Sequence, residues 1–123
     1  MGAQGGTAAV LVADDDSTIR MLCRVNLELE GYRVLEASTS EEIDRALASG
    51  DVAALLLDLR LGPEDGAEIA RRLRTDHPSL RIAFLTGDGS RGDARGQAAD
   101  GFLAKPFSLE ELSATVASLV HRP

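Results

Sequence analysis

The sequence predicts an α/β fold in which helices cover both faces of one parallel sheet. Along the 123 residues, five short apolar runs alternate with segments of helical periodicity. This alternation is typical of parallel strands that are joined by helices. The first and third runs are continuously apolar, as expected for strands buried on both faces. A doubly wound, five-stranded parallel sheet follows from these observations.

The five apolar runs are the predicted strands, and the residues at their ends suggest how they are ordered. Right-handed crossovers leave few possible orders. We adopt the order 2-1-3-4-5 of flavodoxin-like folds, because it places the aspartates after the first strand beside Asp58 after the third. The predicted strands are Ala9–Ala13, Tyr32–Glu36, Val52–Leu57, Arg81–Leu85 and Gly101–Ala104.

Apolar periodicity and capping residues predict the helices between the strands. The second helix opens with the capping-box pair Thr39 and Glu42, and the last helix opens with Ser108 and Glu111. Glycine follows each of the first two helices, as is common at helix ends. The predicted apolar stripes are Ile19, Leu22, Val25 and Leu29; Ile43 and Leu47; Ile69 and Leu73; and Leu109, Leu112, Val116 and Leu119.

The fourth connecting segment has a composition that disfavours a helix. The range Gly87–Gly101 contains five glycines, and each glycine in a helix interior costs about 1 kcal/mol relative to alanine. We therefore expect the fourth of five helices to be short, frayed or partly a loop.

Length and composition limit the class of protein. A chain of 123 residues has room for one domain, which we place at residues 9–121 after a flexible leader at residues 1–8. The net charge of −7 and the pI near 4.7 argue against direct nucleic-acid binding. No run approaches the ~18 apolar residues of a membrane span. The single cysteine, Cys23, cannot form an internal disulfide, so we expect a reducing, cytoplasmic location.

Polar residues follow four of the five predicted strands. They are Asp14, Asp15 and Asp16, then Asp58, then Thr86, then Lys105. Each has an ordinary structural explanation, such as capping a helix or starting a turn. However, ligands of open parallel sheets bind at the carboxyl ends of the strands. Lys105 is also the only lysine among 13 lysine and arginine residues, so together these groups predict a functional site.

The residue types at this edge favour a metal and phosphoryl chemistry. Neighbouring carboxylates repel one another and therefore share protons or recruit a cation. Oxygen-only ligands suit Mg²⁺ (or Mn²⁺), and the two histidines, His77 and His121, are most simply surface residues. An aspartate can act as a nucleophile that forms an acyl phosphate, and Lys105 and Thr86 could hold phosphoryl oxygens. Because there is no GxxxxGK[ST] loop, a nucleotide is not the expected phosphate source.

The chain from Ala9 to Val120 resembles the receiver domain of two-component response regulators, including the chemotaxis type. The motifs that carry the resemblance are VLVADDDSTIR, LLLDLRLGPEDG, FLTGD and GFLAKPF. The resemblance implies that Asp58 accepts a phosphoryl group from a histidine of a sensor kinase or phosphotransfer protein. The chain would then switch conformation to signal in a phosphorelay. It would catalyse only its own phosphorylation and dephosphorylation.

The resemblance also assigns roles to the other residues of the edge. Thr86 and Lys105 would bind the phosphoryl group, and the Lys105–Pro106 peptide would be cis. Asp15 would bind the metal directly, whereas Asp14 would act through water or shape the acidic pocket. The implied metal site comprises Asp14, Asp15, Asp58 and the backbone carbonyl of Arg60.

Several residues are expected to tune or transmit the signal. In this family the threonine hydroxyl moves toward the phosphoryl group while an aromatic residue turns inward; Phe102 matches that aromatic position, and a plain core role is the alternative. Gly87 follows Thr86 directly. We expect Arg60 and Asp88 to pair across the mouth of the site and shield the acyl phosphate. Gly62 stands where the family usually has proline, which predicts a reshaped loop.

Two other functions remain open at this point. The run Asp14–Thr18 also fits the DxDxT pattern of haloacid-dehalogenase-type phosphatases, with Asp14 as nucleophile and Asp16 as acid. A receiver-like binding module that never takes phosphate is the second alternative. Which aspartate becomes phosphorylated distinguishes these readings. The sequence names neither the partner kinase nor the output, and it leaves open whether the chain works alone or within a longer protein.

Overall fold

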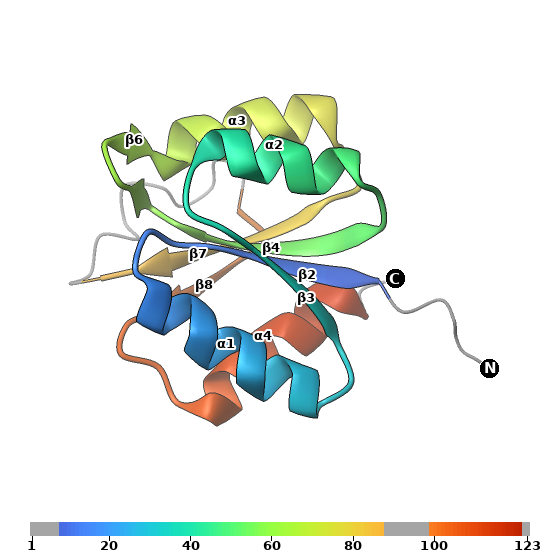
Figure 1. Cartoon of the computed structure of the whole chain (residues 1–123), viewed down its shortest axis with the longest axis vertical. Coiled ribbons are helices and arrows are strands. Elements are labelled where there is room, and N and C mark those ends of the chain that lie inside the picture. Colours follow the sequence, from blue (N-terminus) through green and yellow to red (C-terminus); the bar gives the residue numbers. More distant parts are fainter. Residues whose placement is uncertain (1–7, 88–98, 122–123) are drawn as a thin grey trace.

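The computed structural model describes residues 8–87 and 99–121. Within these residues one five-stranded sheet has the order β3-β2-β4-β7-β8 (Figure 1). Every neighbouring pair in it is parallel. The predicted order 2-1-3-4-5 is therefore confirmed. The strands are β2 (Ala9–Ala13), β3 (Arg33–Ala37), β4 (Val52–Asp58), β7 (Arg81–Thr86) and β8 (Gly101–Ala104).

Helices cover both faces of the sheet (Figure 1). On one face lie α2 (Ser40–Ala48) and α3 (Gly66–Asp76), and on the other lie α1 (Ser17–Leu29) and α4 (Leu109–Val120). Two apolar clusters fill the spaces between the sheet and these layers. Alternate residues of each strand enter opposite clusters, so that Leu55 and Leu57 face α2 and α3 while Leu56 faces α1 and α4. This explains the continuous apolar runs of the central strands.

The part of the chain that the structure describes contains four α-helices, whereas five were predicted. The expected fourth helix falls largely on residues 88–98, which lie outside the described residues. Its short or frayed character stays a prediction. No described helix is long and apolar enough to cross a membrane.

Helix α1 packs through a stripe that shares only Ile19 with the predicted one. The residues that it buries fully are Cys23 and Leu27, whereas Leu22, Val25 and Leu29 of the predicted stripe are exposed. The prediction failed because α1 carries apolar residues on more than one face, and periodicity alone does not say which face meets the sheet. In α4 the prediction was better: Leu112, Val116 and Leu119 are buried, and only Leu109 is exposed.

The predicted helix caps are present, with one difference. Ser108 and Glu111 form a complete capping box at α4. At α2 the Thr39 hydroxyl accepts from the Glu42 N–H at 3.1 Å, but the Glu42 carboxylate accepts from the N–H and hydroxyl of Ser38. The reciprocal half of the predicted box is therefore displaced by one residue.

A small hairpin follows β4 that the sequence did not reveal. Strand β5 (Arg60–Leu61) pairs with β6 (Glu64–Asp65) in antiparallel register. Gly62 lies in the turn with a φ of 60°, a conformation that glycine adopts without strain. Whether this loop departs from that of other receivers stays a prediction.

Asp100 attaches the start of β8 to α3 and β7. Its Oδ2 accepts from the Ile82 N–H at 2.9 Å and from Arg74 Nη2 at 2.7 Å, and its own N–H donates to the Ile82 carbonyl. Burial raises the pKa of Asp100, but the bond from Ile82 and the charges of Arg74 and Arg81 outweigh it, so the pKa lies below its ordinary value.

Replacing Asp100 with Asn should lower the free energy of unfolding at pH 7 by about 1–2 kcal/mol, because charge-assisted hydrogen bonds are lost. A lowered pKa contributes stability above the unfolded-state value near 4 and loses it as the pH falls through the folded-state value. The difference from wild type should thus shrink below pH ~4. Urea unfolding of both proteins at several pH values measures this difference in free energy of unfolding. Asp76→Asn, at an exposed residue of α3, is the control, and equal losses in both variants would contradict this role.

Candidate functional site

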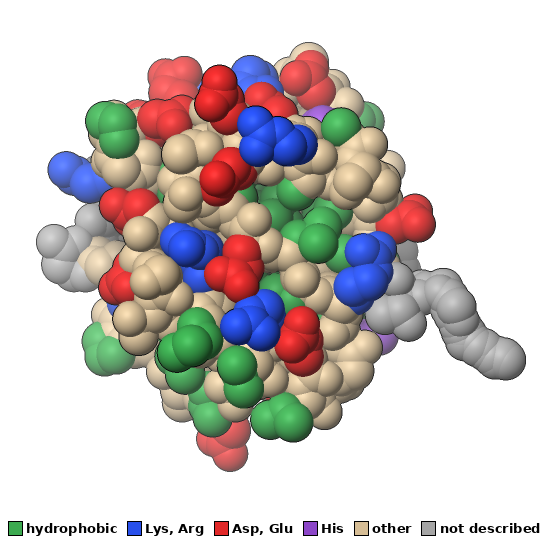
Figure 2. All heavy atoms as spheres, in the orientation of Figure 1, with side chains coloured by type: hydrophobic (Ala, Val, Ile, Leu, Met, Phe, Trp, Pro, Cys, Tyr) green, Lys and Arg blue, Asp and Glu red, His purple; other side chains and the backbone are tan. Residues whose placement is uncertain are grey.

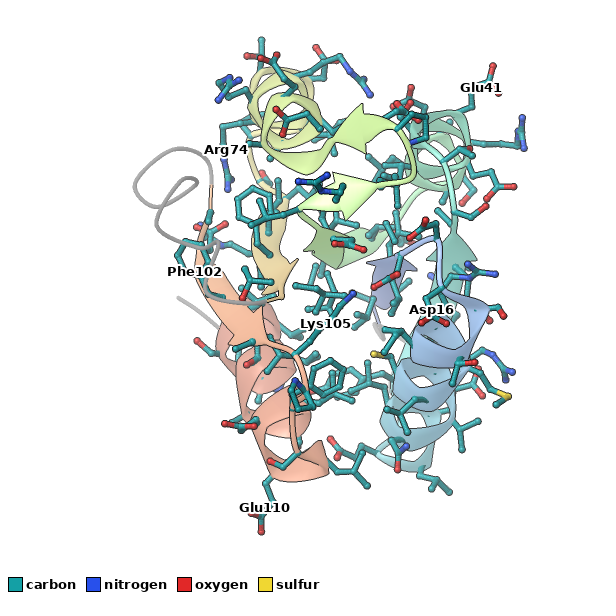
Figure 3. The ribbon with its side chains drawn as sticks, turned by 90° about the vertical axis from the view of Figure 1, so that its left-hand side faces the viewer. Asp16, Glu41, Arg74, Phe102, Lys105 and Glu110 are labelled. Atoms are coloured by element: carbon teal, nitrogen blue, oxygen red, sulfur yellow. The ribbon has the colours of Figure 1, made fainter. Side chains whose placement is uncertain are left out.

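The polar residues predicted after the strands gather at the carboxyl edge of the sheet (Figure 3). The register pairs Ala13 with Leu57, Asp58 with Leu85, and Thr86 with Ala104. Asp58 and Thr86 are the last residues of β4 and β7 rather than the residues just past them. The edge therefore presents, in spatial order, the residues after β2, the end of β4, the end of β7 and the residue after β8.

Three carboxylates form a cluster at this edge. Asp14, Asp15 and Asp58 each offer an oxygen, and these oxygens lie within 4.8 Å of one another. Asp14 is fully buried, Asp58 is partly buried and Asp15 is exposed. An all-oxygen set that is open on one side fits a hard divalent cation such as Mg²⁺, which usually binds one or two carboxylates and keeps several waters. The donor set thus fits the predicted metal.

Asp16 has a different role from its two neighbours. It is the N-cap of α1, and its Oδ1 accepts from the Thr18 N–H at 2.9 Å. The residue therefore stabilises the start of the helix, as aspartate commonly does at this position. Of the three consecutive aspartates, only Asp14 and Asp15 contribute to the cluster.

Lys105 places its ammonium group between two of the carboxylates. Nζ lies 2.7 Å from Asp14 Oδ2 and 3.4 Å from Asp58 Oδ2. Burial lowers the pKa of Lys105, but the contact with Asp14 and the charge of Asp58 outweigh it and raise the pKa above its ordinary value. Burial and the charge of Asp14 raise the pKa of Asp58, against the lowering effect of the Arg60 N–H and Lys105. The edge is thus a site where negative charge accumulates and a cation is drawn in.

Thr86 carries a buried hydroxyl that has no hydrogen-bond partner among the described residues. The residue is 1% exposed, and a buried polar group without a partner is uncommon in folded proteins. Its backbone is well anchored, because the Lys105 N–H donates to the Thr86 carbonyl at 2.7 Å. Thr86 therefore brings a buried hydroxyl, without a hydrogen-bond partner among the described residues, to the strand end next to that of Asp58.

Comparison with known proteins identifies the family. The family model described as the response regulator receiver domain matches residues 10–117. The chain belongs to the receiver family. It is 34% identical over 122 residues to the sensor kinase CckA of Brucella abortus, and 34% identical over 116 residues to the transcriptional regulatory protein SrrA of Staphylococcus aureus. These alignments cover 95% and 92% of the chain.

The fold and the extent of the receiver agree with solved structures. A response regulator receiver domain protein from Clostridium thermocellum superposes with a TM-score of 0.85 at 29% identity, over 94% of this chain and 95% of that one. In contrast, the chain spans 13% of the length of the sensor kinase and 48% of the length of the transcriptional regulator. Receivers act as signalling switches, and those of response regulators receive phosphate from sensor kinases.

The backbone around Asp58 in this receiver is held closely. The Arg60 N–H donates to Asp58 Oδ1 at 3.0 Å, and the Gly66 N–H donates to the Leu59 carbonyl at 2.8 Å. A Cβ on Gly66 would overlap the backbone of Asp58 and Leu59. Sequence reasoning missed Gly66, although a glycine that opens a helix directly after an aspartate was an available signal for such a close approach.

The structure describes some of the residues predicted to switch or tune the signal, but not all of them. The ring of Phe102 is partly buried and lies 6.0 Å from that of Phe84, so its position fits both the core role and an inward-turning role. The Lys105–Pro106 peptide is cis, as predicted. Asp88 lies outside the described residues, so its pairing with Arg60, whose side chain is exposed, stays a prediction, and so does any role for Gly87.

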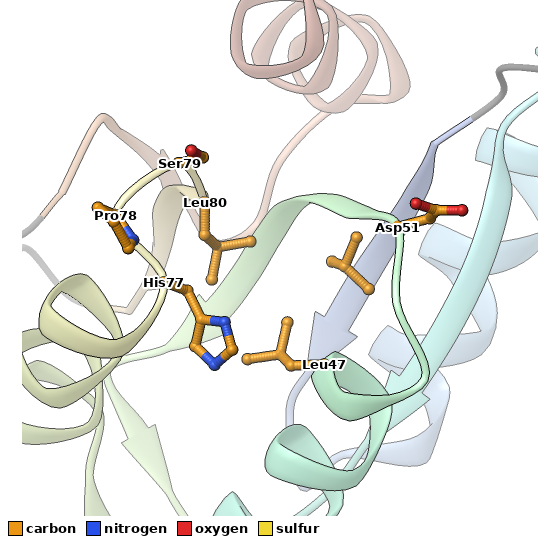
Figure 4. A pocket seen from close by; sticks show the side chains of 7 residues that line it. Leu47, Asp51, His77, Pro78, Ser79 and Leu80 are labelled. Carbon is orange, nitrogen blue, oxygen red and sulfur yellow. The ribbon is translucent and has the colours of Figure 1, made fainter.

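The site is an open edge, and a hollow elsewhere on the receiver is distinct from it. A cavity of about 290 Å³ lies at the amino ends of β4 and β7, lined by Leu47, Asp51, Val52, His77, Pro78, Ser79 and Leu80 (Figure 4). These are the opposite ends of the strands from Asp58 and Thr86. The carboxylate chemistry therefore does not occur in this cavity.

Replacing Thr86 with Val should leave the free energy of unfolding unchanged or raise it by up to about 1 kcal/mol, because the buried hydroxyl that it removes has no hydrogen-bond partner among the described residues. Urea unfolding measures this. Thr39→Val makes the same chemical change where the hydroxyl caps α2, and it should cost about 1 kcal/mol. Destabilisation of the Thr86 variant as large as that of the Thr39 variant would show that the hydroxyl has a partner.

Proposed function

We propose that this receiver accepts a phosphoryl group on Asp58 from a phosphohistidine and thereby acts as a phosphorelay switch. The observation that carries the proposal is the position of the Lys105 ammonium between Asp14 and Asp58, at 2.7 and 3.4 Å. A cation in this place can leave one carboxylate and follow the charge of an incoming phosphoryl group. The unpartnered Thr86 hydroxyl offers a second group for its oxygens.

The proposed reaction is a direct transfer. A carboxylate oxygen of Asp58 attacks phosphorus, the bond between phosphorus and the donor imidazole nitrogen breaks, and the imidazole leaves with the electron pair. Lys105 and Thr86 hold oxygens of the transferred group and so stabilise its charge. Water attack on the resulting acyl phosphate returns the carboxylate and inorganic phosphate. No other substrate is turned over, so we regard the chain as a switch rather than an enzyme.

The proposed metal ligands are Asp14, Asp15, Asp58 and the Arg60 carbonyl. A bound Mg²⁺ or Mn²⁺ would neutralise charge that develops on the phosphoryl oxygens. Asp15 is the exposed member of the cluster and is suited to direct binding, whereas buried Asp14 already faces Lys105. We propose that Asp14 acts mainly by shaping the pocket.

The phosphatase alternative is less well supported. It requires Asp16 as a free acid, but the Asp16 carboxylate caps α1. It also leaves no role for Asp58, which lies within the cluster. A module that never binds phosphate would have no use for the unpartnered Thr86 hydroxyl, which is costly to bury.

Incubation with acetyl phosphate and Mg²⁺ should add one phosphoryl group to the wild-type protein and none to Asp58→Asn, as read by intact-protein mass. EDTA should abolish the adduct. Asp16→Asn is the matched control: asparagine caps helices as well as aspartate, so this variant should keep both its stability and its adduct. An adduct that survives in Asp58→Asn would favour the phosphatase reading instead, in which Asp14 is the nucleophile.

The phosphodonor would dock on an apolar surface beside the site. Met21, Leu22, Val25 and Leu29 of α1 are 52%, 38%, 44% and 80% exposed, and Leu109 at the start of α4 is 48% exposed. Figure 2 shows hydrophobic side chains grouped over α1. Exposed apolar groups of this kind commonly mark interaction surfaces. Because α1 begins directly after the acidic cluster, a kinase or phosphotransfer protein bound here would present its histidine to Asp58.

Val25→Glu should slow transfer from a phosphorylated histidine kinase or phosphotransfer protein by about tenfold or more, since a charge would enter an apolar contact. Phosphorylation by acetyl phosphate should be unchanged. Thr75→Glu adds the same charge at an exposed position of α3 on the opposite face of the sheet and should affect neither reaction. Equal rates for all three proteins with the histidine donor would exclude the α1 surface.

Other observations support a proposal for the output of the receiver and for its location. The matched relatives include a sensor kinase and a transcriptional regulator, so we propose that the receiver signals through protein contacts set by its context. Its net charge of −7 supports the absence of direct nucleic-acid binding. The proposed location is the cytoplasm, where the free Cys23 thiol would stay reduced.

A further inference from the structure

We propose that Arg20 is a positioning residue for the metal site, because its guanidinium fixes the peptide that joins Asp14 to Asp15. The inference rests on the proposed function of the acidic cluster. Arg20 does not itself touch the carboxylates of the cluster. It acts on the backbone from which two of them project.

Arg20 bridges the loop after β2 and the neighbouring strand β3. Its Nη1 donates to the backbone carbonyl of Asp14 at 2.7 Å, and its Nε donates to Glu36 Oε1 at 3.0 Å. The side chain is 19% exposed. The N–H groups of a planar guanidinium point in fixed directions. The bond of the Arg20 guanidinium to Glu36 therefore also fixes the direction in which the Asp14 carbonyl must point to accept from it.

The orientation of this carbonyl matters because a peptide unit is planar. The Asp14 carbonyl and the Asp15 N–H belong to the same rigid unit, so fixing one fixes the direction in which the chain enters Asp15. The Asp15 side chain has no hydrogen bond or ion pair to any other residue in the described parts of the chain. Its position therefore depends on the backbone, which Arg20 restrains at the Asp14–Asp15 peptide.

The other contacts of the loop hold Asp14 but leave this peptide free. The Asp14 N–H donates to the Ala37 carbonyl at 3.1 Å. Its Oδ1 accepts from the Asp16 N–H at 2.9 Å, and its Oδ2 faces Lys105. These contacts fix the peptide before Asp14, the Asp14 side chain and the Asp15–Asp16 peptide, but not the Asp14–Asp15 peptide. The bond from Arg20 adds the restraint on the peptide that follows.

Arg24 shares the ion-pair network and provides a matched comparison. Its Nε donates to Glu36 Oε2 at 2.7 Å, and its Nη1 lies 3.6 Å from Glu28. Figure 2 shows basic and acidic side chains alternating over α1 and β3. Arg24 makes no bond to the loop after β2. Losing Arg24 thus removes a positive charge and a Glu36 partner, as losing Arg20 does, while leaving the Asp14 carbonyl bond intact.

Whether replacing Arg20 strengthens or weakens Mg²⁺ binding distinguishes a positioning role of this residue from a simple effect of its charge. Removing a positive charge near carboxylates should strengthen Mg²⁺ binding. Removing a group that orients ligands should weaken it, and such outer groups typically contribute about 10–100-fold to metal affinity. Weaker binding by a variant that has lost a positive charge would therefore identify a positioning role.

Isothermal titration of Mg²⁺ into wild type, Arg20→Gln, Arg24→Gln and Arg20→Lys tests the proposal. We expect the Kd of Arg20→Gln to rise about tenfold, that of Arg24→Gln to stay unchanged or fall, and that of Arg20→Lys to lie between wild type and Arg20→Gln. Urea midpoints in EDTA should be alike for the two glutamine variants. Equal or tighter Mg²⁺ binding by Arg20→Gln would overturn the inference, as would a weakening that Arg24→Gln matches.

A second variant covers the case in which Arg20→Gln fails to fold. Glu36→Gln keeps both arginines but weakens the contact that directs the Arg20 guanidinium. Because it also removes a negative charge, which by itself weakens Mg²⁺ binding, the decisive outcome is unchanged or tighter binding, which would count against the proposal. The outcome is separable from that of the proposed function. If wild type binds Mg²⁺ but forms no adduct on Asp58, the phosphoacceptor assignment fails, while the titrations still decide the role of Arg20.

Discussion

Mutual repulsion of three carboxylates at one edge of the sheet is the constraint on which the rest of the site depends. Asp14, Asp15 and Asp58 bring oxygens within 4.8 Å of one another, and the repulsion within such a group is relieved by a proton or by a cation. Lys105 supplies part of that charge in the described structure. The parallel pairing of β2, β4, β7 and β8 makes this meeting possible, because residues far apart in sequence end their strands at the same edge.

Around the acidic cluster, side chains and backbone are held in place at a cost in folding free energy. Thr86 buries a hydroxyl that has no hydrogen-bond partner among the described residues, and Asp14 buries a carboxylate. Burying either group costs free energy that packing alone would not require. Around them the backbone is restrained by the Arg60 N–H, by the close approach of Gly66 and by the Arg20 guanidinium. Buried polar groups that break ordinary packing rules are typical of functional sites, and in this chain they lie around Asp58.

Helix α1 contacts the loop of the acidic cluster and also has an exposed apolar face. It buries Cys23 and Leu27 against the sheet and leaves a second apolar stripe, with Met21 and Val25, facing solvent. The same helix begins at Asp16, which caps it, and carries Arg20, which holds the loop of the cluster. One element thus contacts the loop of the acidic cluster and also carries the exposed apolar residues proposed as the docking surface, so the site and its proposed partner surface belong to the same helix.

The sequence by itself determined the strand order, the residues at the carboxyl edge and the cap at Ser108, because these depend on local periodicity and on the known geometry of parallel sheets. Only the tertiary structure decided what each neighbouring residue does. Of three consecutive aspartates, one is buried, one is exposed and one caps a helix. Leu22, Val25 and Leu29 of the predicted apolar stripe of α1 are exposed. Such choices depend on hydrogen bonds and packing between segments distant in sequence, like that of Arg20 with Glu36, which local patterns do not encode.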